Sequence, residues 1–337
     1  MHIFIVKNTQ APLFSSGKLC YTAHRKQGRQ NLKVFLCENI HPEALALLKT
    51  RAAIISDWDN IAEAEAIINR NLRLPAELLS KMPRLRAIAV HGTGHDGIDM
   101  EYCREKNITV FYVPFENADS VAELILAFSL ALLRKLPLAD RLLLSGEIRE
   151  TAPAVLFGNE LMGKTVAFLG VGDIARRAAR IFREGFRANV IGYAPSFTKE
   201  KAEKWQIGYT ESLSELLSRA DILCIGVHLT PETKGMIGEH ELSQMKSSAI
   251  LINTARGAVI DEKALYMALK EKKIAAAACD VFENEPPTLE NPLLSLENFL
   301  ATPHIGANTD EALRRVGIKM VEELFCLFDG KTPQYCY

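Results

Sequence analysis

Short apolar runs alternate with amphipathic segments along the chain from Leu32 onward. In the first third, the apolar runs and the helical spacing predict strands at 32–37, 65–69, 85–90 and 108–113 and helices at 41–48, 75–81 and 100–106. Strands that alternate with helices form parallel sheets with helices on both faces. We therefore expect the first third to fold as one α/β unit.

A second series of the same kind follows a polar connector at 145–159. Its predicted strands are 166–169, 189–192, 222–227, 249–253, 275–281 and 299–302. Six such strands match the doubly wound dinucleotide-binding fold. A strongly apolar helix that ends near Leu133 precedes the series and is expected to be buried, with Ser120 and Glu123 as its capping box. A last helix is expected at about 309–329.

The strand predicted at 166–169 runs into a Gly-x-Gly-x-x-Ala turn formed by Gly170, Gly172 and Ala175. Gly170 permits the tight turn, and Gly172 lets the backbone approach a pyrophosphate because no Cβ intervenes. The helix that follows presents free N–H groups and the positive end of its dipole. The sequence therefore predicts a dinucleotide site at this turn.

Composition narrows the possible partners. The 337 residues are 48% hydrophobic and 24% charged with a net charge of −1, which favours about two globular domains and no nucleic acid partner. No apolar run is long enough to cross a membrane, and no metal site is predicted. Seven scattered cysteines without a Cys-x-x-Cys pair indicate reduced thiols and a cytoplasmic location. Residues 1–31 are expected to be an extension of unknown role.

Three chemically suitable side chains follow neighbouring strands of the second series. Arg256, Glu285 and His304 come after the strands at 249–253, 275–281 and 299–302, so they are expected at one edge of the sheet. An arginine binds a carboxylate through two N–H groups, a histidine transfers a proton near neutral pH, and a carboxylate orients the imidazole. Each residue alone also fits an ordinary loop role. Together they favour hydride chemistry on a 2-keto or 2-hydroxy acid beside a nicotinamide.

Six motifs between residues 32 and 330 carry a resemblance to a known family. They are the glycine turn and the segments 120–123, 230–235, 253–257, 280–286 and 302–306. With them the chain resembles the D-isomer-specific 2-hydroxyacid dehydrogenases, most like the phosphoglycerate dehydrogenase branch. The resemblance implies hydride transfer between NAD(P) and a small D-2-hydroxy acid or 2-keto acid, with 3-phosphoglycerate and hydroxypyruvate as candidates. It also implies a homodimer joined through the nucleotide-binding domain.

The resemblance assigns roles to individual residues. Arg256 is implied to bind the substrate, Glu285 to partner the histidine and His304 to act as the acid/base. The implied substrate-binding residues are His91, Gly92, Thr93 and Asn117, and Arg70 is a further candidate that is equally well interpreted as a solvated charge. The implied cofactor-binding residues are Gly170, Gly172, Asp173, Ile174, Ala194, His228, Leu229, Thr230, Thr254, Ala255, Arg256, Asp280, His304 and Gly306.

The resemblance further implies two interleaved domains. Residues 32–116 and 306–337 are expected to form a flavodoxin-like substrate domain around a Rossmann-type nucleotide domain at 117–305. Three features depart from the family. The substrate loop holds two histidines, His91 and His95, where small or apolar residues are common. Ala194 stands where an acid usually binds the adenine ribose, which leaves NADP open; because no arginine occupies the site, we expect NAD. Asp173 stands where a basic residue is common, and its carboxylate should weaken pyrophosphate binding unless it points away.

One alternative belongs to a different functional class. The same fold is found in corepressor-like proteins that sense NAD(H) and change their assembly. The presence of the complete Arg, Glu and His set favours the enzyme over this binding protein.

Overall fold

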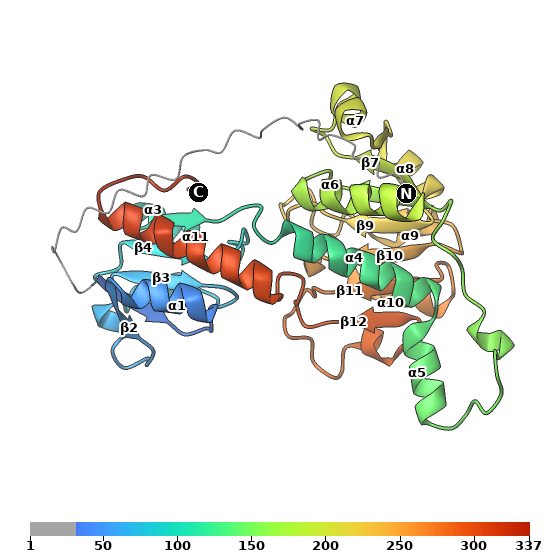
Figure 1. Cartoon of the computed structure of the whole chain (residues 1–337), viewed down its shortest axis with the longest axis horizontal. Helices are drawn as coiled ribbons and strands as arrows, with labels where there is room; N and C mark the ends of the chain where they lie inside the picture. The colour runs from blue at the N-terminus through green and yellow to red at the C-terminus, as the bar shows by residue number, and fades with distance from the viewer. Residues whose placement is uncertain (1–31) are drawn as a thin grey trace, which may run out of the picture.

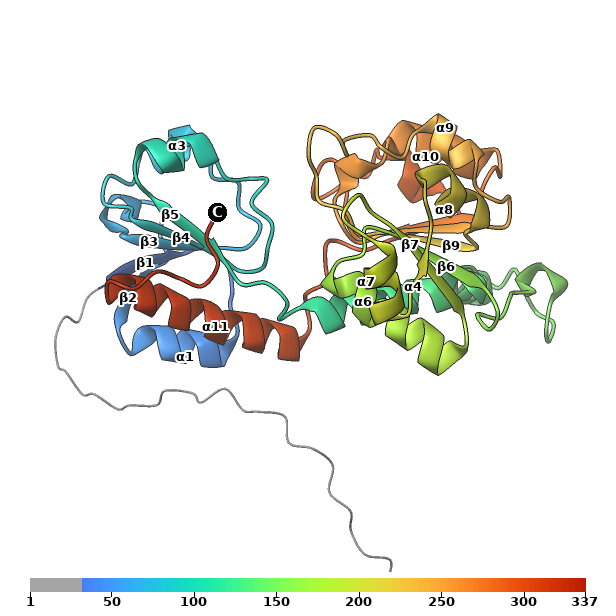
Figure 2. The same cartoon turned by 90° about the horizontal axis from the view of Figure 1, so that it is seen from above.

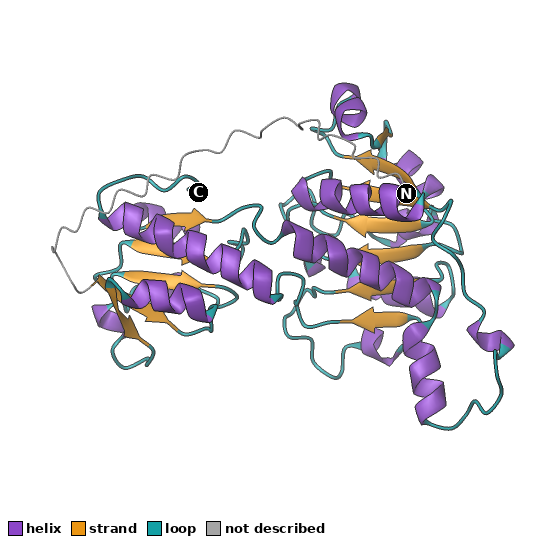
Figure 3. Cartoon of the chain, in the orientation of Figure 1, coloured by secondary structure: helices purple, strands orange, loops and turns teal. Residues whose placement is uncertain are grey.

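The fold is described by a computed structural model that covers residues 32–337, and the extension predicted at 1–31 lies outside the described residues. Two parallel α/β sheets stand next to each other along the long axis of the molecule (Figure 1). The carboxyl ends of their strands face each other (Figure 3). Two doubly wound parallel sheets are the predicted fold class, which is thereby confirmed.

The first sheet has five strands in the order β2-β1-β3-β4-β5. They are β1 (Leu32–Leu36), β2 (Ala52–Ile55), β3 (Ala66–Asn69), β4 (Ala87–Val90) and β5 (Thr109–Tyr112). One face is covered by α1 (Pro42–Lys49) and α11 (Asp310–Phe328), and the other by α2 (Ala76–Leu79) and α3 (Met100–Glu105) (Figure 2). The last helix of the chain therefore packs on the first sheet, and its apolar side chains share that sheet's core.

The second sheet has seven strands in the order β12-β11-β10-β9-β6-β7-β8. They are β6 (Thr165–Leu169), β7 (Asn189–Tyr193), β8 (Gly208–Tyr209), β9 (Ile222–Ile225), β10 (Ile250–Asn253), β11 (Ala276–Cys279) and β12 (Phe299–Ala301). The strand order reverses between β6 and β9, which is where doubly wound sheets bind nucleotides.

Helices cover both faces of the second sheet. One face carries α4 (Ala118–Leu133), α6 (Asp173–Arg180) and α7 (Lys199–Trp205), and the other carries α8 (Leu213–Arg219), α9 (Glu239–Ser243) and α10 (Glu262–Lys270). The short helix α5 (Leu136–Leu144) projects from the end of α4 (Figure 1). Among residues 32–337, no helix combines the length and apolar character needed to cross a bilayer.

The predicted capping box of α4 is wrong. The helix begins three residues earlier, with Asn117 as its N-cap, and Ser120 lies inside the first turn. The Ser120 hydroxyl donates instead to the carbonyl oxygen of Gly306, 2.7 Å away. This contact ties the start of α4 to the loop that carries His304.

Candidate active site

Arg256 lies on the tight loop that follows β10. The buried Asn253 shapes this loop, because its Nδ2 donates to Arg256 O at 2.9 Å and its Oδ1 accepts from Ala255 N at 3.0 Å. A Cβ on Gly257 would lie 1.9 Å from the backbone carbon of Phe282. Only glycine therefore lets this loop pass so close to the loop that carries Glu285.

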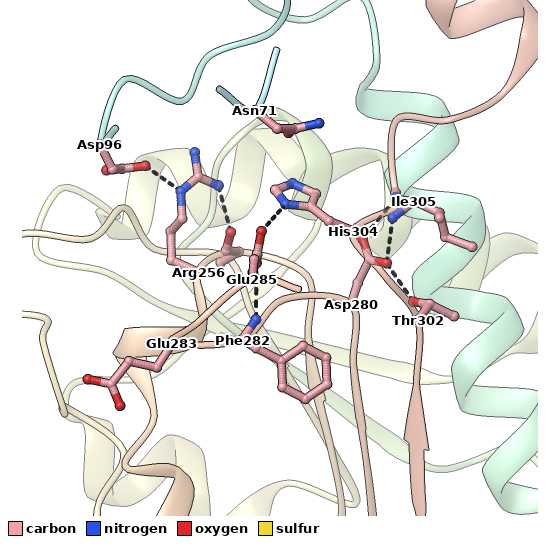
Figure 4. Close-up of polar contacts among 12 residues, drawn as sticks. Asn71, Asp96, Arg256, Asp280, Phe282, Glu283, Glu285, Thr302, His304 and Ile305 are labelled. Atoms are coloured by element: carbon pink, nitrogen blue, oxygen red, sulfur yellow. Dashed lines mark hydrogen bonds and ion pairs between the residues drawn. The ribbon is translucent and has the colours of Figure 1, made fainter. Parts of the chain in front are cut away.

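His304 and Glu285 form a hydrogen-bonded pair, with Nδ1 and Oε2 2.8 Å apart (Figure 4). The other Glu285 oxygen accepts from Phe282 N at 3.0 Å. Burial alone would raise the pKa of Glu285, but the His304 contact, the Phe282 N–H and the Arg256 charge together lower it. Glu285 is thus held as an anion that orients the imidazole. Since Nδ1 is engaged, Nε2 is the nitrogen that remains for proton transfer.

Hydrogen bonds to the buried Asp280 stabilise the loop that carries His304. Its Oδ1 accepts from the Thr302 hydroxyl at 2.5 Å and from Ile305 N at 2.7 Å, and its Oδ2 accepts from Gly306 N at 2.7 Å (Figure 4). His304 N donates to the Asp280 carbonyl oxygen, and the His304 backbone is left-handed with a φ of 56°. The resemblance places Asp280 near the nicotinamide amide; in the structure its carboxylate faces the histidine loop.

Asp96, a residue that the motifs did not single out, reaches Arg256 from the first sheet. It lies on the loop after β4, and its Oδ2 accepts from Arg256 Nε at 2.5 Å (Figure 4). Partial loss of solvent contact would raise the pKa of Asp96, but the Arg256 charge and hydrogen bond lower it. The ion pair therefore joins the two sheets across the site. An acid in a glycine-rich loop after a strand was the available sequence signal.

The loop after β3 also faces the site. The Glu38 carboxylate accepts from three consecutive backbone N–H groups, those of Arg70, Asn71 and Leu72, at 2.7 to 3.4 Å. Figure 4 shows the Asn71 side chain beside the His304 ring in that view. The Arg70 guanidinium donates to Asn39 O at 3.0 Å and to Asn308 Oδ1 at 3.5 Å. The candidate Arg70 is therefore held by protein acceptors close to the loop that follows His304.

His91 follows β4, and its ring packs beside Gly317 of α11. Its Nε2 is buried and has no hydrogen-bond partner among the described residues. Burial, helped by the charge of Arg70, lowers the pKa of His91 to about 4. His91 is therefore neutral at pH 7.

This shift makes stability depend on pH. Between pH 6.5 and about 4 the unfolded chain takes up a proton on His91 that the folded protein does not. The free energy of unfolding should therefore fall by roughly 3 kcal/mol as pH falls through that range. Urea unfolding at pH values of about 7.5 and about 4.5 measures this loss, which should be smaller in His91→Asn than in the wild type. An equal loss of stability in both proteins would contradict the assignment.

The glycine turn forms an open cradle at the carboxyl end of β6. Gly170 has a φ of 92°, and a Cβ there would lie 2.5 Å from Gly226 O, so the turn requires glycine. Gly172 is the N-cap of α6, and no atom lies within 4 Å of where its Cβ would be. Open space thus faces the free N–H groups at the start of α6. These residues fit a dinucleotide pyrophosphate.

Asp173, the first residue of α6, is paired within its own helix. Its two oxygens accept from Arg176 Nη2 and Arg177 Nε, each at 2.9 Å, and Arg177 also pairs with Asp119 of α4. Two guanidinium groups therefore offset the negative charge of this carboxylate, which on its own would repel a pyrophosphate. Ile174 packs against the apolar core below.

The remaining predicted cofactor residues follow other strands of the same sheet. Ala194 follows β7, the segment His228, Leu229 and Thr230 follows β9, and Thr254 and Ala255 follow β10. The Thr233 hydroxyl donates to His228 O at 2.6 Å and accepts from Thr230 N at 2.8 Å, which closes the loop after β9. Gly92 and Thr93 follow β4 of the first sheet, and Asn117 lies at the start of α4.

Two glycine substitutions should separate cofactor binding from folding. Gly172→Ala places its Cβ in open space at a φ of −83°, so stability should be unchanged while NADH binding weakens roughly tenfold or more. Gly170→Ala should instead destabilise the fold by about 1–3 kcal/mol. Thermal melts and fluorescence titrations with NADH measure both. Equal NADH affinity in Gly172→Ala and wild type would place the pyrophosphate elsewhere.

Comparison with known proteins identifies the family. Residues 126–306 match the family model described as D-isomer specific 2-hydroxyacid dehydrogenase, NAD binding domain. The chain belongs to the D-isomer specific 2-hydroxyacid dehydrogenase family. The matched region includes every strand of the second sheet, so the NAD-binding domain of this family is the unit that holds the glycine cradle.

Relatives across this dehydrogenase family align with most of the chain. It is 37% identical over 315 residues to D-3-phosphoglycerate dehydrogenase of Methanocaldococcus jannaschii, covering 90% of this chain and 59% of that protein. It is 36% identical over 318 residues to glyoxylate reductase of Aeropyrum pernix, covering 89% and 94%. A crystal structure of Aquifex aeolicus D-lactate dehydrogenase with NAD and lactic acid matches with a TM-score of 0.77 at 30% identity, covering 88% and 96%.

Proposed function

We propose that the protein transfers a hydride between NAD(H) and a small 2-keto acid or D-2-hydroxy acid. The observation that carries the proposal is the His304–Glu285 pair, which stands at the same sheet edge as Arg256 and the glycine cradle. The chain spans 59% of the length of the phosphoglycerate dehydrogenase it matches, but 94% of the glyoxylate reductase. The comparisons give no support to the corepressor-like alternative.

Each of the three side chains has a separate role in the reduction. The cradle at Gly170 and Gly172 would hold NADH, which would supply the hydride for the carbonyl carbon. Arg256 binds the substrate carboxylate with its guanidinium and fixes the carbonyl beside the histidine. His304 donates a proton from Nε2 to the carbonyl oxygen as negative charge develops there. Glu285 stabilises the protonated imidazole and holds its orientation. In oxidation the same histidine takes the hydroxyl proton.

The test is a spectrophotometric screen of cofactor oxidation. NADH and NADPH are each offered with pyruvate, glyoxylate, hydroxypyruvate, 2-oxoglutarate and phosphohydroxypyruvate. We expect turnover of at least one of these keto acids and, where reduction creates a stereocentre, a D-configured product. Absence of turnover with every keto acid, together with tight NADH binding, would contradict the enzyme and favour the corepressor-like NAD(H)-binding protein.

We propose NAD rather than NADP as the preferred cofactor. The loop after β7 carries Ala194 and Ser196 without an arginine, and the Lys201 ammonium donates to Ser196 O at 2.6 Å. A 2′-phosphate would have to compete for that lysine. The NADH and NADPH arms of the screen decide between the two cofactors.

The interleaved domains and the homodimer are part of the same proposal. Packing of α11 on the first sheet supports a substrate domain of 32–116 with 306–337 around a nucleotide domain of 117–305. Side chains on α5 and the following segment leave apolar surface exposed that a second copy of the chain would cover; they are Leu136, Leu143, Leu144, Val155, Phe157 and Met162. Sedimentation of a species of twice the 37.4 kDa chain mass would support the dimer. The cytoplasmic location stays a prediction.

A further inference from the structure

The segment Tyr335–Tyr337 pairs with the edge strand of the first sheet. Tyr112 N donates to Tyr335 O at 3.1 Å, Tyr337 N donates to Val110 O at 3.0 Å, and an antiparallel bridge joins Phe111 to Cys336. The segment therefore covers β5, the last strand in the sheet order. This pairing brings the Tyr337 side chain to the carboxyl end of β4.

The Tyr337 side chain contacts the loop that follows β4. Its hydroxyl donates to Thr93 O at 2.5 Å. Its ring contacts His95 in a tilted arrangement with centroids 4.0 Å apart and stacks on Tyr112 with centroids 4.4 Å apart. Tyr337 therefore holds the loop by one hydrogen bond and one ring contact, while its other face rests on β5.

The same loop holds the Arg256 guanidinium. Asp96 accepts from Arg256 Nε, and a Cβ on Gly94 would lie 2.0 Å from Arg256 Nη2. The guanidinium thus packs directly on the loop backbone and is paired with its acid. A continuous set of contacts runs from Tyr337 through residues 93–96 to Arg256.

We propose that Tyr337 is a positioning residue for Arg256, which it orients through the Thr93–Asp96 loop. The inference rests on the function proposed above, in which Arg256 binds the substrate carboxylate. Asp96 and Gly97 are exposed, and a surface loop with few buried contacts opens easily unless it is fastened. If the Arg256 guanidinium is displaced by even about 1 Å, the substrate carbonyl is poorly aligned with the hydride donor and with His304.

A purely structural role makes a different prediction. If Tyr337 only covers the edge of β5, its ring and backbone are what matter. Tyr337→Phe keeps both and removes only the hydroxyl that donates to Thr93 O. The matched control is Tyr335→Phe. Tyr335 lies in the same segment, contacts the same Tyr112 ring at 5.7 Å, and its hydroxyl accepts from Gln334 rather than from the loop.

Steady-state kinetics test the positioning. For the best keto acid of the screen, Tyr337→Phe should raise KM and lower kcat, so that kcat/KM falls roughly three- to tenfold, as expected for loss of one hydrogen bond. The NADH dissociation constant should be unchanged, and Tyr335→Phe should match the wild type. Equal kinetics in the two tyrosine variants would overturn the proposal.

A double-mutant cycle tests the route. If Tyr337 acts through Asp96, the effect of Tyr337→Phe should shrink to less than about twofold in an Asp96→Ala background. If Tyr337→Phe changes the kinetics by the same factor in the Asp96→Ala background as in the wild type, Tyr337 does not act on Arg256 through this loop.

Hydrogen exchange separates failure of the proposal from failure of the proposed function. Amides of residues 92–97 should exchange faster in Tyr337→Phe than in the wild type and in Tyr335→Phe. If the wild type reduces no keto acid, the proposed function fails while this measurement still decides whether Tyr337 fastens the loop. Unchanged exchange in Tyr337→Phe would overturn the proposal.

Discussion

Replacing His304 should lower kcat for keto acid reduction by roughly two to four orders of magnitude. The variant should be His304→Asn, because asparagine tolerates the left-handed backbone of this position, with its φ of 56°, and cannot transfer the proton. The half-exposed side chain fills no core space, so the fold and the NADH affinity should persist. Stopped-flow or steady-state measurement of NADH oxidation gives the effect.

The conservative change Glu285→Gln is the companion experiment. Glutamine can still contact Nδ1, but the negative charge that favours the protonated imidazole is lost. The imidazolium that reduction uses then lacks its charged partner, so kcat should fall roughly tenfold while the NADH affinity is unchanged. Near-normal turnover in His304→Asn, or a wild-type kcat in Glu285→Gln, would show that the residue concerned takes no part in the chemistry.

Replacing Arg256 with alanine should reduce kcat/KM for the keto acid by about two to four orders of magnitude. The guanidinium provides charge-assisted hydrogen bonds worth about 1.5–3 kcal/mol each and also fixes the direction of the carbonyl. Both KM and kcat should therefore change. The measurement is saturation kinetics with the keto acid at saturating NADH.

The matched variant Arg256→Lys keeps the charge and loses the forked geometry. It should recover only part of the activity, because a lysine presents a single point charge to a carboxylate. Unchanged kinetics in Arg256→Ala would show that another group binds the carboxylate. Full activity in Arg256→Lys would show that charge alone suffices.

Much of the fold was predictable because the buried strands are continuous apolar runs. The strands from β6 to β12 repeat this signal often enough to predict a doubly wound sheet, with the exception of β8. The missed strands β2 and β8 are edge strands of their sheets, and Ile55 is the only one of their six residues that is buried. The helix α5 was missed as well; Lys135, with a left-handed φ of 52°, separates it from α4.

The site was predictable only in part. Arg256, Glu285 and His304 follow neighbouring parallel strands, and the carboxyl ends of such strands share one edge. Their roles stay predictions, although the contact between Glu285 and His304 is what those roles require. The capping-box prediction failed because a local Ser-x-x-Glu pattern does not reveal that Ser120 donates to Gly306, 186 residues away.

Contacts between distant parts of the chain account for what the sequence did not reveal. Asp96 and Arg256 are 160 residues apart, and Tyr337 and Thr93 are 244 residues apart. No local period or spacing connects such pairs. The Asp96–Arg256 pair becomes visible only when the two sheets are placed with the carboxyl ends of their strands facing each other, and the Tyr337–Thr93 pair only when residues 335–337 are placed on β5.

A crystal structure of the protein with NADH and oxamate, an unreactive analogue of a 2-keto acid, tests the central claim most directly. We expect the oxamate carboxylate on the Arg256 guanidinium, its carbonyl oxygen at His304 Nε2, and the pyrophosphate over Gly172. Oxamate bound away from both Arg256 and His304, or a nicotinamide ring remote from them, would contradict the account.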